Sequence, residues 1–271
     1  MGSKDTRATT ALQDKVISTE VTMGIFAFRD DNITSTLISN PYTFKFDTEG
    51  NFSHSGEKIL YYPSQTTVGL NLYSYIPYDA TYTEFNGSYD FTVQSDQIED
   101  LNYLSSDLLY GTFTSARADN VANINYTHKL SRLDFTLNLG DGIDMADMYG
   151  AVVSLVGINC TVTFKPSDGS ISAASGAATD IPFLKIQTGA TATSYTASVR
   201  FPPQTLEKGD FIKITLRDGT VITKTLESDF TTAENKYYTS SYTLTATEVK
   251  GSSASVKKFD EVNITGSATE Q

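Results

Sequence analysis

Apolar and polar residues alternate along most of this chain with a period of two. Between residues 131 and 139, Leu133, Phe135 and Leu137 share one side of an extended backbone, while Asp134 and Thr136 share the other. This alternation predicts half-buried β-strands, because successive side chains of a strand lie on opposite faces. The same pattern recurs at residues 42–46, 68–72, 212–216, 222–226 and 238–246. Threonine fills many of the polar positions, and its branched Cβ suits a pleated surface.

Turn-forming residues separate these runs. Asp218-Gly219 lies between two alternating segments, and we expect a hairpin there with a type I′ turn, which needs positive φ at both central residues. Further turn signals lie at residues 47–51, 86–87, 166–169 and 207–210. The one helix candidate is a short turn at residues 96–104, with Asp96 as its N-cap. Many short strands separated by such turns predict an all-β fold built from antiparallel β-sandwiches.

The strand pattern slips by one position between residues 126 and 139. Tyr126, His128 and Leu130 share one parity, and the apolar residues from 133 onward share the other. A β-bulge near Ser131 and Arg132 would absorb this slip and bend the chain as it passes between domains. We therefore predict two antiparallel β-sandwich domains in tandem, residues 1–132 and 133–271, with a boundary between about 120 and 140.

Composition supports a folded core and excludes some partners. Hydrophobic residues make up 39% of the 271 residues, so a core can form and general disorder is not expected. Lys and Arg number 20 against 32 Asp and Glu, which gives a formal net charge of −12. Such a surface repels phosphate backbones and anionic lipid, which argues against nucleic-acid binding and basic membrane docking. The single cysteine, Cys160, lies in an apolar strand-like run and is expected to be a buried thiol.

The groups that enzymes use are scarce in this sequence. There are only two histidines, His54 and His128, and neither stands in a metal-ligand or triad spacing. His128 is expected on a half-buried strand face with a local hydrogen bond. The acidic residues between positions 84 and 107 stand beside turn residues, which favours a solvated surface over a glycosidase pair. We expect no catalytic residue, no metal site and no cofactor, and hence a protein that is not an enzyme.

Tyrosines gather between residues 61 and 82, and two interpretations remain open for them. In the first, they are structural: Pro63 and Pro77 end strands, and the tyrosine rings pack in half-buried positions while their hydroxyls stay in contact with water. In the second, Tyr73, Tyr75 and Tyr78, together with Tyr82, are exposed and stack on sugar rings as a carbohydrate-binding platform. The absence of tryptophan weakens this second interpretation.

Several short segments resemble one protein family in order and spacing. Residues 59–63 (ILYYP) followed by 68–78 (VGLNLYSYIPY) resemble the "YYP … Y-x-PY" signature of the fimbrillin family, the type V pilus subunits and related surface adhesins of Bacteroidetes-type bacteria. Residues 106–111 (SDLLYG) resemble its "sDLLyA" segment, with Gly111 for the usual Ala. Residues 126–133 (YTHKLSRL) are similar to its "F-x-H-x-LSkL" strand, and residues 24–28 (GIFAF) to its opening strand. The resemblance is clearest over residues 7–140. It departs from the family near the end, where the family usually carries a Trp and this chain has Phe259 and no Trp at all.

This resemblance implies a fold and a place in the cell. It implies two β-sandwich domains of transthyretin-like Greek-key topology. It also implies a secreted lipoprotein precursor, held in the bacterial outer membrane only through its lipid anchor, that functions at the cell surface in a fimbria. The implied role is a non-enzymatic fimbrial subunit or fimbria-associated adhesin. The implied partners are other fimbrial subunits, together with host or bacterial surface glycans or proteins.

The resemblance further implies assembly by protease-triggered strand exchange. Arg7, in TRAT, corresponds to the family's site for an arginine-specific protease, and Arg29 is a second candidate. After cleavage a strand leaves the first domain, and a strand of a neighbouring subunit fills the groove, satisfying the free backbone groups of the sheet edge. We expect the donor strand in the C-terminal segment, with these apolar residues facing the groove: Val256, Phe259, Val262 and Ile264.

Overall fold

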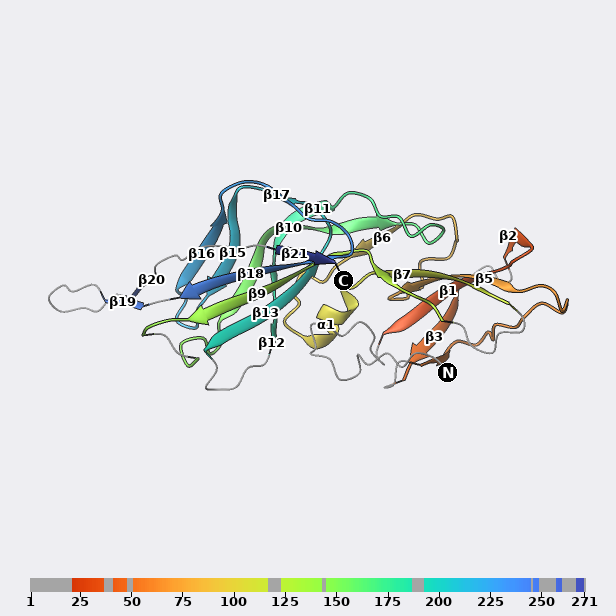
Figure 1. Cartoon of the computed structure of the whole chain (residues 1–271), viewed down its shortest axis with the longest axis horizontal. Helices are drawn as coiled ribbons and strands as arrows, with labels where there is room; N and C mark the ends of the chain where they lie inside the picture. Colours follow the sequence, from red (N-terminus) through yellow and green to blue (C-terminus); the bar gives the residue numbers. More distant parts are fainter. Residues whose placement is uncertain are drawn as a thin grey trace. The chain divides into compact units, whose positions relative to one another are not determined.

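The structure is a computed structural model that describes residues 21–36, 41–47, 51–116, 123–142, 145–186, 193–244, 246–248, 257–259 and 267–270. Strands dominate these residues (Figure 1), so the predicted all-β class is confirmed. In chain order the elements are β1 (Thr22–Arg29), β2 (Asn32–Thr36), β3 (Tyr42–Phe46), β4 (Phe52–His54), β5 (Leu70–Ile76), β6 (Tyr89–Thr92), α1 (Asp100–Ser105), β7 (Leu109–Ser115), β8 (Thr127–His128), β9 (Ser131–Leu139), β10 (Val152–Phe164), β11 (Ser175–Pro182), β12 (Leu184–Ile186), β13 (Ser194–Phe201), β14 (Thr205–Leu206), β15 (Gly209–Thr215), β16 (Val221–Leu226), β17 (Phe230–Thr231), β18 (Lys236–Leu244), β19 (Ala246–Glu248), β20 (Lys257–Phe259) and β21 (Ser267–Glu270).

The chain forms two compact units, each built from more than one stretch of sequence. The first contains residues 1–93, 104–130 and 161–176, and the second contains residues 94–103, 131–160 and 177–271. One passage from the first unit to the second lies between Leu130 and Ser131. A division into tandem domains at residue 132 stays a prediction.

A single large sheet organises the first unit. Its strand order is β4-β3-β1-β5-β7-β8, with β2 also paired to β1. Residues 23–28 of β1 are all buried, which the sequence MGIFAF allows because both faces of the strand are apolar or small. The next strand, β5, is likewise buried on both faces over residues 74–76. The two strands therefore form the centre of the unit's core.

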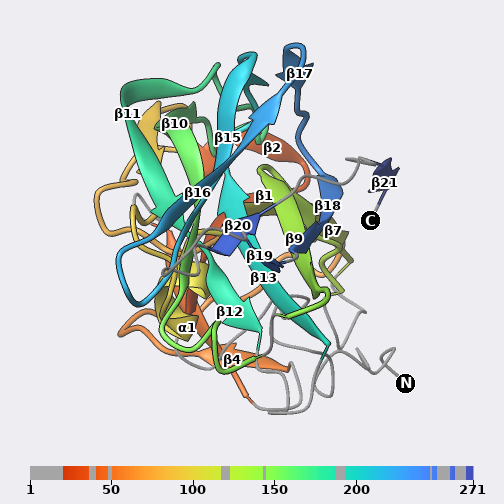
Figure 2. The ribbon, with the colours of Figure 1, turned by 90° about the vertical axis from the view of Figure 1, so that its left-hand side faces the viewer.

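Two sheets form the second unit as facing layers (Figures 1 and 2). One has the order β12-β13-β9-β18-β21 and the other the order β11-β10-β15-β16. The long strand β10 continues into the first unit, where its residues 161–164 pair with β6. Between the layers, the ring centroid of Phe135 lies 6.1 Å from that of Phe183 and 5.7 Å from that of Tyr242. The alternation predicted for residues 133–137 is confirmed, with Leu133, Phe135 and Leu137 buried.

The pairing of β9 with β18 is parallel, although its other neighbour β13 is antiparallel. Ser131 pairs with Lys236 at one end and Leu139 with Leu244 at the other. A parallel pair needs a long connection, and here the intervening chain supplies β10–β17. The sequence pattern had indicated only antiparallel sheets, so this pair departs from the expectation.

The slip in strand parity has a different cause from the predicted bulge. β8 ends at His128 and β9 begins at Ser131, so two separate strands replace one bulged strand. The last hydrogen bond beside the β7–β8 pair runs from the backbone N–H of Lys129 to the carbonyl of Leu108, 2.8 Å away. β9 then pairs with β13 and β18 instead. The parity change marks this exchange of partners.

The helix and the hairpin are both present, with local differences. α1 begins at Asp100, and Asp96 accepts a hydrogen bond from the N–H of Ile98 in a turn ahead of it, so Asp96 is not the N-cap. The hairpin joins β15 to β16, but only Gly219 has positive φ, at 86°. The N–H of Gly219 donates to the carbonyl of Leu216, and the N–H of Leu216 donates to the carbonyl of Thr220. This is a type I turn followed by a left-handed glycine, not a type I′ turn.

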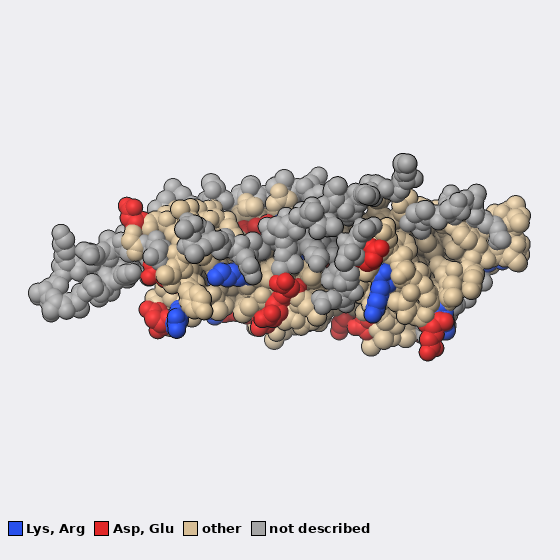
Figure 3. Space-filling view, turned by 90° about the horizontal axis from the view of Figure 1, so that it is seen from below, with Lys and Arg blue, Asp and Glu red and all other residues tan. Residues whose placement is uncertain are grey.

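The surface carries dispersed charge. In the face shown in Figure 3, acidic and basic side chains of the described residues lie in small separate groups. Cys160 is buried as expected, and burial raises the pKa of its thiol. No helix among the described residues is long and apolar enough to cross a membrane.

Candidate functional site

Two segments that carry the family resemblance lie side by side in the first unit. Leu109 pairs with His128 and Tyr110 with Thr127, which joins the SDLLYG segment to the YTHKLSRL segment. The structure explains why residue 111 is a glycine, because a Cβ there would lie 2.5 Å from the carbonyl oxygen of Asn125. A strand residue with a side chain does not fit under this neighbouring backbone without a shift. The two segments are therefore one packed structure.

The same pairing brings a histidine to a carboxylate. His128 Nδ1 lies 2.9 Å from Asp107 Oδ1, and the side chains are 17% and 3% exposed. The expected half-buried position of His128 is confirmed, but its hydrogen bond joins it to a residue 21 positions away in the sequence instead of a local one. The sequence did not indicate Asp107 as its partner, since the two are separated by a whole strand. Among the described residues, no group of three His, Cys, Asp or Glu side chains is placed to hold a metal ion.

The clustered tyrosines are mostly core residues. Tyr75 is 0% exposed and Tyr82 is 2% exposed, and their ring centroids lie 5.4 Å apart. The interpretation in which these two are exposed is wrong, because Tyr75 packs against Tyr82 and Phe164, and Tyr82 packs against Phe164 and Tyr89 as well. Burial raises the pKa of both phenols. Tyr73 and Tyr78 are half-buried, and Tyr73 packs edge-on against Phe28 and Phe85. Binding of sugar by Tyr73, Tyr75 and Tyr78 stays untested, but Tyr75 offers no face for stacking.

Tyr75 is fitted to a glycine of the opening strand. A Cβ at Gly24 would lie 2.5 Å from Tyr75 Cζ and 2.8 Å from its Oη. Gly24 and Tyr75 are direct neighbours in the antiparallel pairing of β1 and β5. The ring therefore lies across the strand at the one position that lacks a side chain. Its Oη is buried and has no hydrogen-bond partner among the residues that the structure describes.

The residues expected in proteolysis and strand donation are placed only in part. Arg7, Val256, Val262 and Ile264 lie outside the described residues. Phe259 ends β20, where it pairs with Ala246 of β19. Arg29 ends β1, and its guanidinium donates two hydrogen bonds to Asp31, at 2.8 and 2.7 Å. A protease needs an extended and accessible segment, so a paired strand residue such as Arg29 is a poor substrate.

A short C-terminal strand occupies a sheet edge in the second unit. β21 pairs antiparallel with β18, from Lys236 with Glu270 to Thr239 with Ser267. It is the last strand in its sheet, and four residue pairs hold it. An edge strand of this length has few backbone hydrogen bonds to lose when it is replaced.

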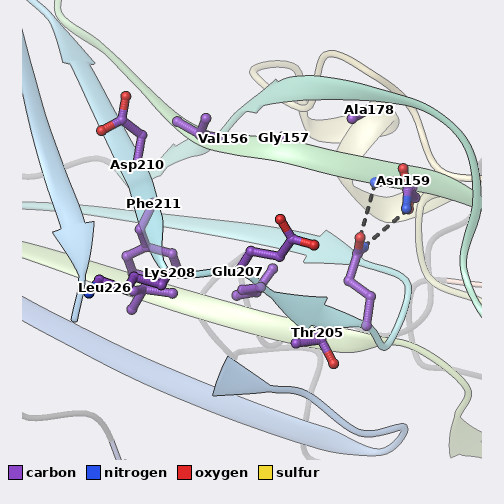
Figure 4. Close-up of a pocket in the computed structure, with 12 residues that line it drawn as sticks. Val156, Gly157, Asn159, Ala178, Thr205, Glu207, Lys208, Asp210, Phe211 and Leu226 are labelled. Atoms are coloured by element: carbon purple, nitrogen blue, oxygen red, sulfur yellow. Dashed lines mark hydrogen bonds between the residues drawn. The ribbon is translucent and has the colours of Figure 1, made fainter. Parts of the chain in front are cut away.

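A polar pocket lies in the second unit beside β10, β14 and β15 (Figure 4). It is a hollow of about 360 Å³ whose apolar part includes the buried side chains Leu206 and Phe211. The exposed side chains Glu207, Lys208 and Asp210 also line it. Pockets of this size accept small molecules, and polar groups on their walls set the orientation of a ligand.

The side chain of Gln204 forms part of the pocket wall and binds the edge of β10 in the way a paired strand does. Gln204 Nε2 donates to the carbonyl of Asn159, and the N–H of Asn159 donates to Gln204 Oε1, both at 3.1 Å (Figure 4). The amide thus copies the paired hydrogen bonds of a neighbouring β-strand. The pairing of β15 with β16 shifts register between Asp210 and Ile212. Such a bulge changes the direction of nearby side chains and often lies beside a functional site. Sequence reasoning missed this pocket, because its residues come from segments that are distant along the chain.

Comparison with known proteins decides the family. A model of the fimbrillin-like family matches residues 6–258. The chain belongs to the fimbrillin-like family. The resemblance found in the sequence is therefore confirmed. No curated protein matches this fimbrillin-like chain.

Solved structures from Bacteroides share the fold of this fimbrillin-like protein. A candidate cell adhesion protein from Bacteroides uniformis is 18% identical with a TM-score of 0.67, covering 95% of this chain and 94% of its own. One from Bacteroides ovatus is 15% identical with a TM-score of 0.64, covering 94% and 89%. One from Bacteroides fragilis is 11% identical with a TM-score of 0.56, covering 93% and 86%. At these identities the likeness concerns the fold.

Proposed function

We propose that this protein is a non-enzymatic fimbrial subunit or fimbria-associated adhesin that joins its neighbours by β-strand exchange. The observation that carries the proposal is the fimbrillin-like family match over residues 6–258. The solved structures with the same fold are described as candidate cell adhesion proteins, which agrees with a role in adhesion. The protein then functions at the bacterial cell surface, and a lipid anchor on the precursor attaches it to the outer membrane.

Strand exchange has physical support in the arrangement of the sheets. β21 is a short terminal strand held by β18 alone among the described strands, so its removal frees one row of backbone groups. Once released from β18, the C-terminal chain is free to enter the groove of a neighbouring subunit, where it makes new backbone hydrogen bonds and buries alternate side chains. We assign the donor to the C-terminal segment that contains Val256, Phe259, Val262 and Ile264. Cleavage after Arg7 releases the strand of the first unit that the donor replaces.

Protease treatment of the precursor tests this proposal. Incubation with an arginine-specific protease is expected to cut after Arg7 and to produce higher oligomers, seen by mass spectrometry and electron microscopy. The Arg7→Ala variant is expected to lose both the cut and the oligomers. The Arg29→Ala variant is the matched control and is expected to behave as the unaltered protein, because Arg29 lies in a paired strand. A chain that is never cut near Arg7 and stays monomeric contradicts the polymerising role.

A second candidate function is binding of a surface glycan. The observation that favours it is the polar pocket, where carboxylates and an apolar floor meet in about 360 Å³. Sugars offer hydroxyls to Glu207 and Asp210 and an apolar face to the floor. A glycan array probed with the whole protein is expected to show binding that the Asp210→Ala variant loses. The Tyr78→Ala variant tests the tyrosine platform in the same assay, and silence of the array removes this candidate.

A further inference from the structure

Strand β16 leaves one edge of its sheet open. It pairs with β15 on one side and, in the described part of the chain, has no strand on the other. The hydrogen bond from the N–H of Leu216 to the carbonyl of Thr220 shows which residue pairs of the hairpin are joined by ladder hydrogen bonds, since such pairs alternate with pairs that are not. Thr215 and Val221 are then a pair without ladder hydrogen bonds, and so are Lys213 and Thr223. The backbone N–H groups of Val221 and Thr223 therefore point away from β15.

The solvent-exposed side chains of β16 are of the kind that favours pairing with another strand. Val221, Thr223 and Thr225 are all exposed, and Val221 is 54% exposed. These residues are β-branched and uncharged, so nothing on this face repels an incoming strand. An open edge with such a face is a template for pairing with another chain.

The inward face of the same strand carries a buried lysine. Lys224 is 5% exposed, and its ammonium lies 5.5 Å from the ring centroid of Tyr242 on β18. None of the ion pairs found among the described residues includes this ammonium. Lys224 is not completely enclosed, so a little water still reaches its side chain. A cation in this position depends on that remaining water and on the ring.

We propose that Lys224 keeps the β16 edge closed to other strands, including the β16 of a second copy. A strand paired with the free edge of β16 displaces water from that edge, and with it the little water that still reaches Lys224. The charge is then buried without a carboxylate, which opposes the gain from the new backbone hydrogen bonds. Inward-pointing charges on edge strands protect natural sheets in this way.

The consequence for assembly is selectivity among edges. This role of Lys224 in assembly rests on the proposed function, in which subunits join through one sheet edge. A subunit that polymerises by strand exchange must leave its other edges unpaired. Lys224 removes β16 from the sheet edges that a partner strand can use.

Self-association of the full chain, without protease, tests the inference. The Lys224→Met variant keeps the length of the side chain and removes its charge. It is expected to self-associate at least about tenfold more tightly than the unaltered protein in sedimentation velocity. Its amides at Val221 and Thr223 are expected to gain protection from hydrogen exchange. The Thr225→Met variant is the matched control, since it adds the same side chain to the opposite face of the strand, and no change is expected.

A second variant identifies the surface used. Thr223→Pro removes an N–H that points away from β15 and leaves the ladder with β15 intact, as edge prolines do. The double variant Thr223→Pro, Lys224→Met is expected to return to the association state of the unaltered protein. The inference is overturned if folded Lys224→Met associates no more than the parent, if Thr225→Met associates equally, or if proline fails to reverse the effect. None of these readouts needs cleavage at Arg7, so failure of protease-triggered assembly remains a separate result.

Discussion

At the scale of single residues, the close fit between Gly24 and Tyr75 shows how the opening strand is specified. The ring of Tyr75 lies where any other residue at position 24 would place its Cβ. Because Tyr75 is 0% exposed and in contact with Phe26 and Phe164, the ring has no free space to move into. Such close-packed interiors respond to one added methyl group.

Gly24→Ala is therefore expected to lower the free energy of unfolding by about 1–3 kcal/mol, the usual cost of overpacking. Urea unfolding followed by circular dichroism measures it. Tyr75→Phe is the companion variant, and it is expected to be neutral or slightly stabilising, since its buried Oη has no hydrogen-bond partner to lose. A strong loss of stability in Tyr75→Phe contradicts this account of the ring.

Residue burial was only partly predictable from the sequence. The buried set at Leu133, Phe135 and Leu137 follows directly from alternation. The same reasoning failed for Tyr75, because alternation places it opposite Leu70 and Leu72 and says nothing about whether the second face is also covered. Tyrosine adds to the difficulty, since its ring suits a core and its hydroxyl suits a surface. The packing of Tyr82 and Phe164 against the ring of Tyr75 decides the matter.

At the scale of elements, one ion pair joins three neighbouring strands. Lys213 of β15 forms an ion pair with Asp180 of β11, and the N–H of Gly157 in β10 donates to the same carboxylate at 3.1 Å. The Lys213 hydrogen bond is the main cause that holds the pKa of Asp180 below its ordinary value of 3.8. The carboxylate therefore supports the sheet only while it is ionised.

The effect of pH follows from the direction of this shift. A carboxyl whose pKa is lower in the folded state stabilises the fold above its unfolded pKa, and this contribution is lost as pH falls through the folded pKa. Asp180→Asn keeps the acceptor for Gly157 and removes the charge. It is expected to cost about 0.5–1 kcal/mol at neutral pH, because both side chains are about a third exposed and screened by solvent.

Urea unfolding at a series of pH values measures this difference. The deficit of Asp180→Asn relative to the parent is expected to disappear at pH values below the lowered pKa of Asp180. The control is Asp210→Asn, an exposed carboxylate on β15 for which no ion pair is found among the described residues. A deficit that persists unchanged in acid contradicts the role of the charge.

Elements were more predictable in kind than in connection. Alternation and turn residues located the β15–β16 hairpin, but Asp-Gly fits both a type I′ turn and the observed turn with one left-handed residue. The break between β8 and β9 appeared in the sequence as a slip of parity, and its cause was a change of partner strands. The pairing of β9 with β18 left no local signal, because ladder hydrogen bonds involve the backbone of every residue alike.

At the scale of the whole molecule, the family was accessible from the sequence, whereas the pocket and the edges were not. The segments SDLLYG and YTHKLSRL, which resemble motifs of the fimbrillin-like family, pack against each other in this chain, as Asp107 and His128 show. The pocket beside Gln204 depends on three-dimensional proximity of Asn159 and Asp210, which no linear spacing encodes. The division into tandem domains and the Greek-key topology stay predictions.

The parallel pairing of β9 with β18 also sets an order of events during biosynthesis. The partners are separated by roughly a hundred residues, and contacts this distant in sequence form slowly because a long loop must close first. While the chain is still emerging, β9 can find β13 but not β18, so one flank of the strand stays unpaired until residues 236–244 are made. The second unit is therefore completed late, and a chain shortened before Lys236 is expected to collect in aggregates instead of maturing.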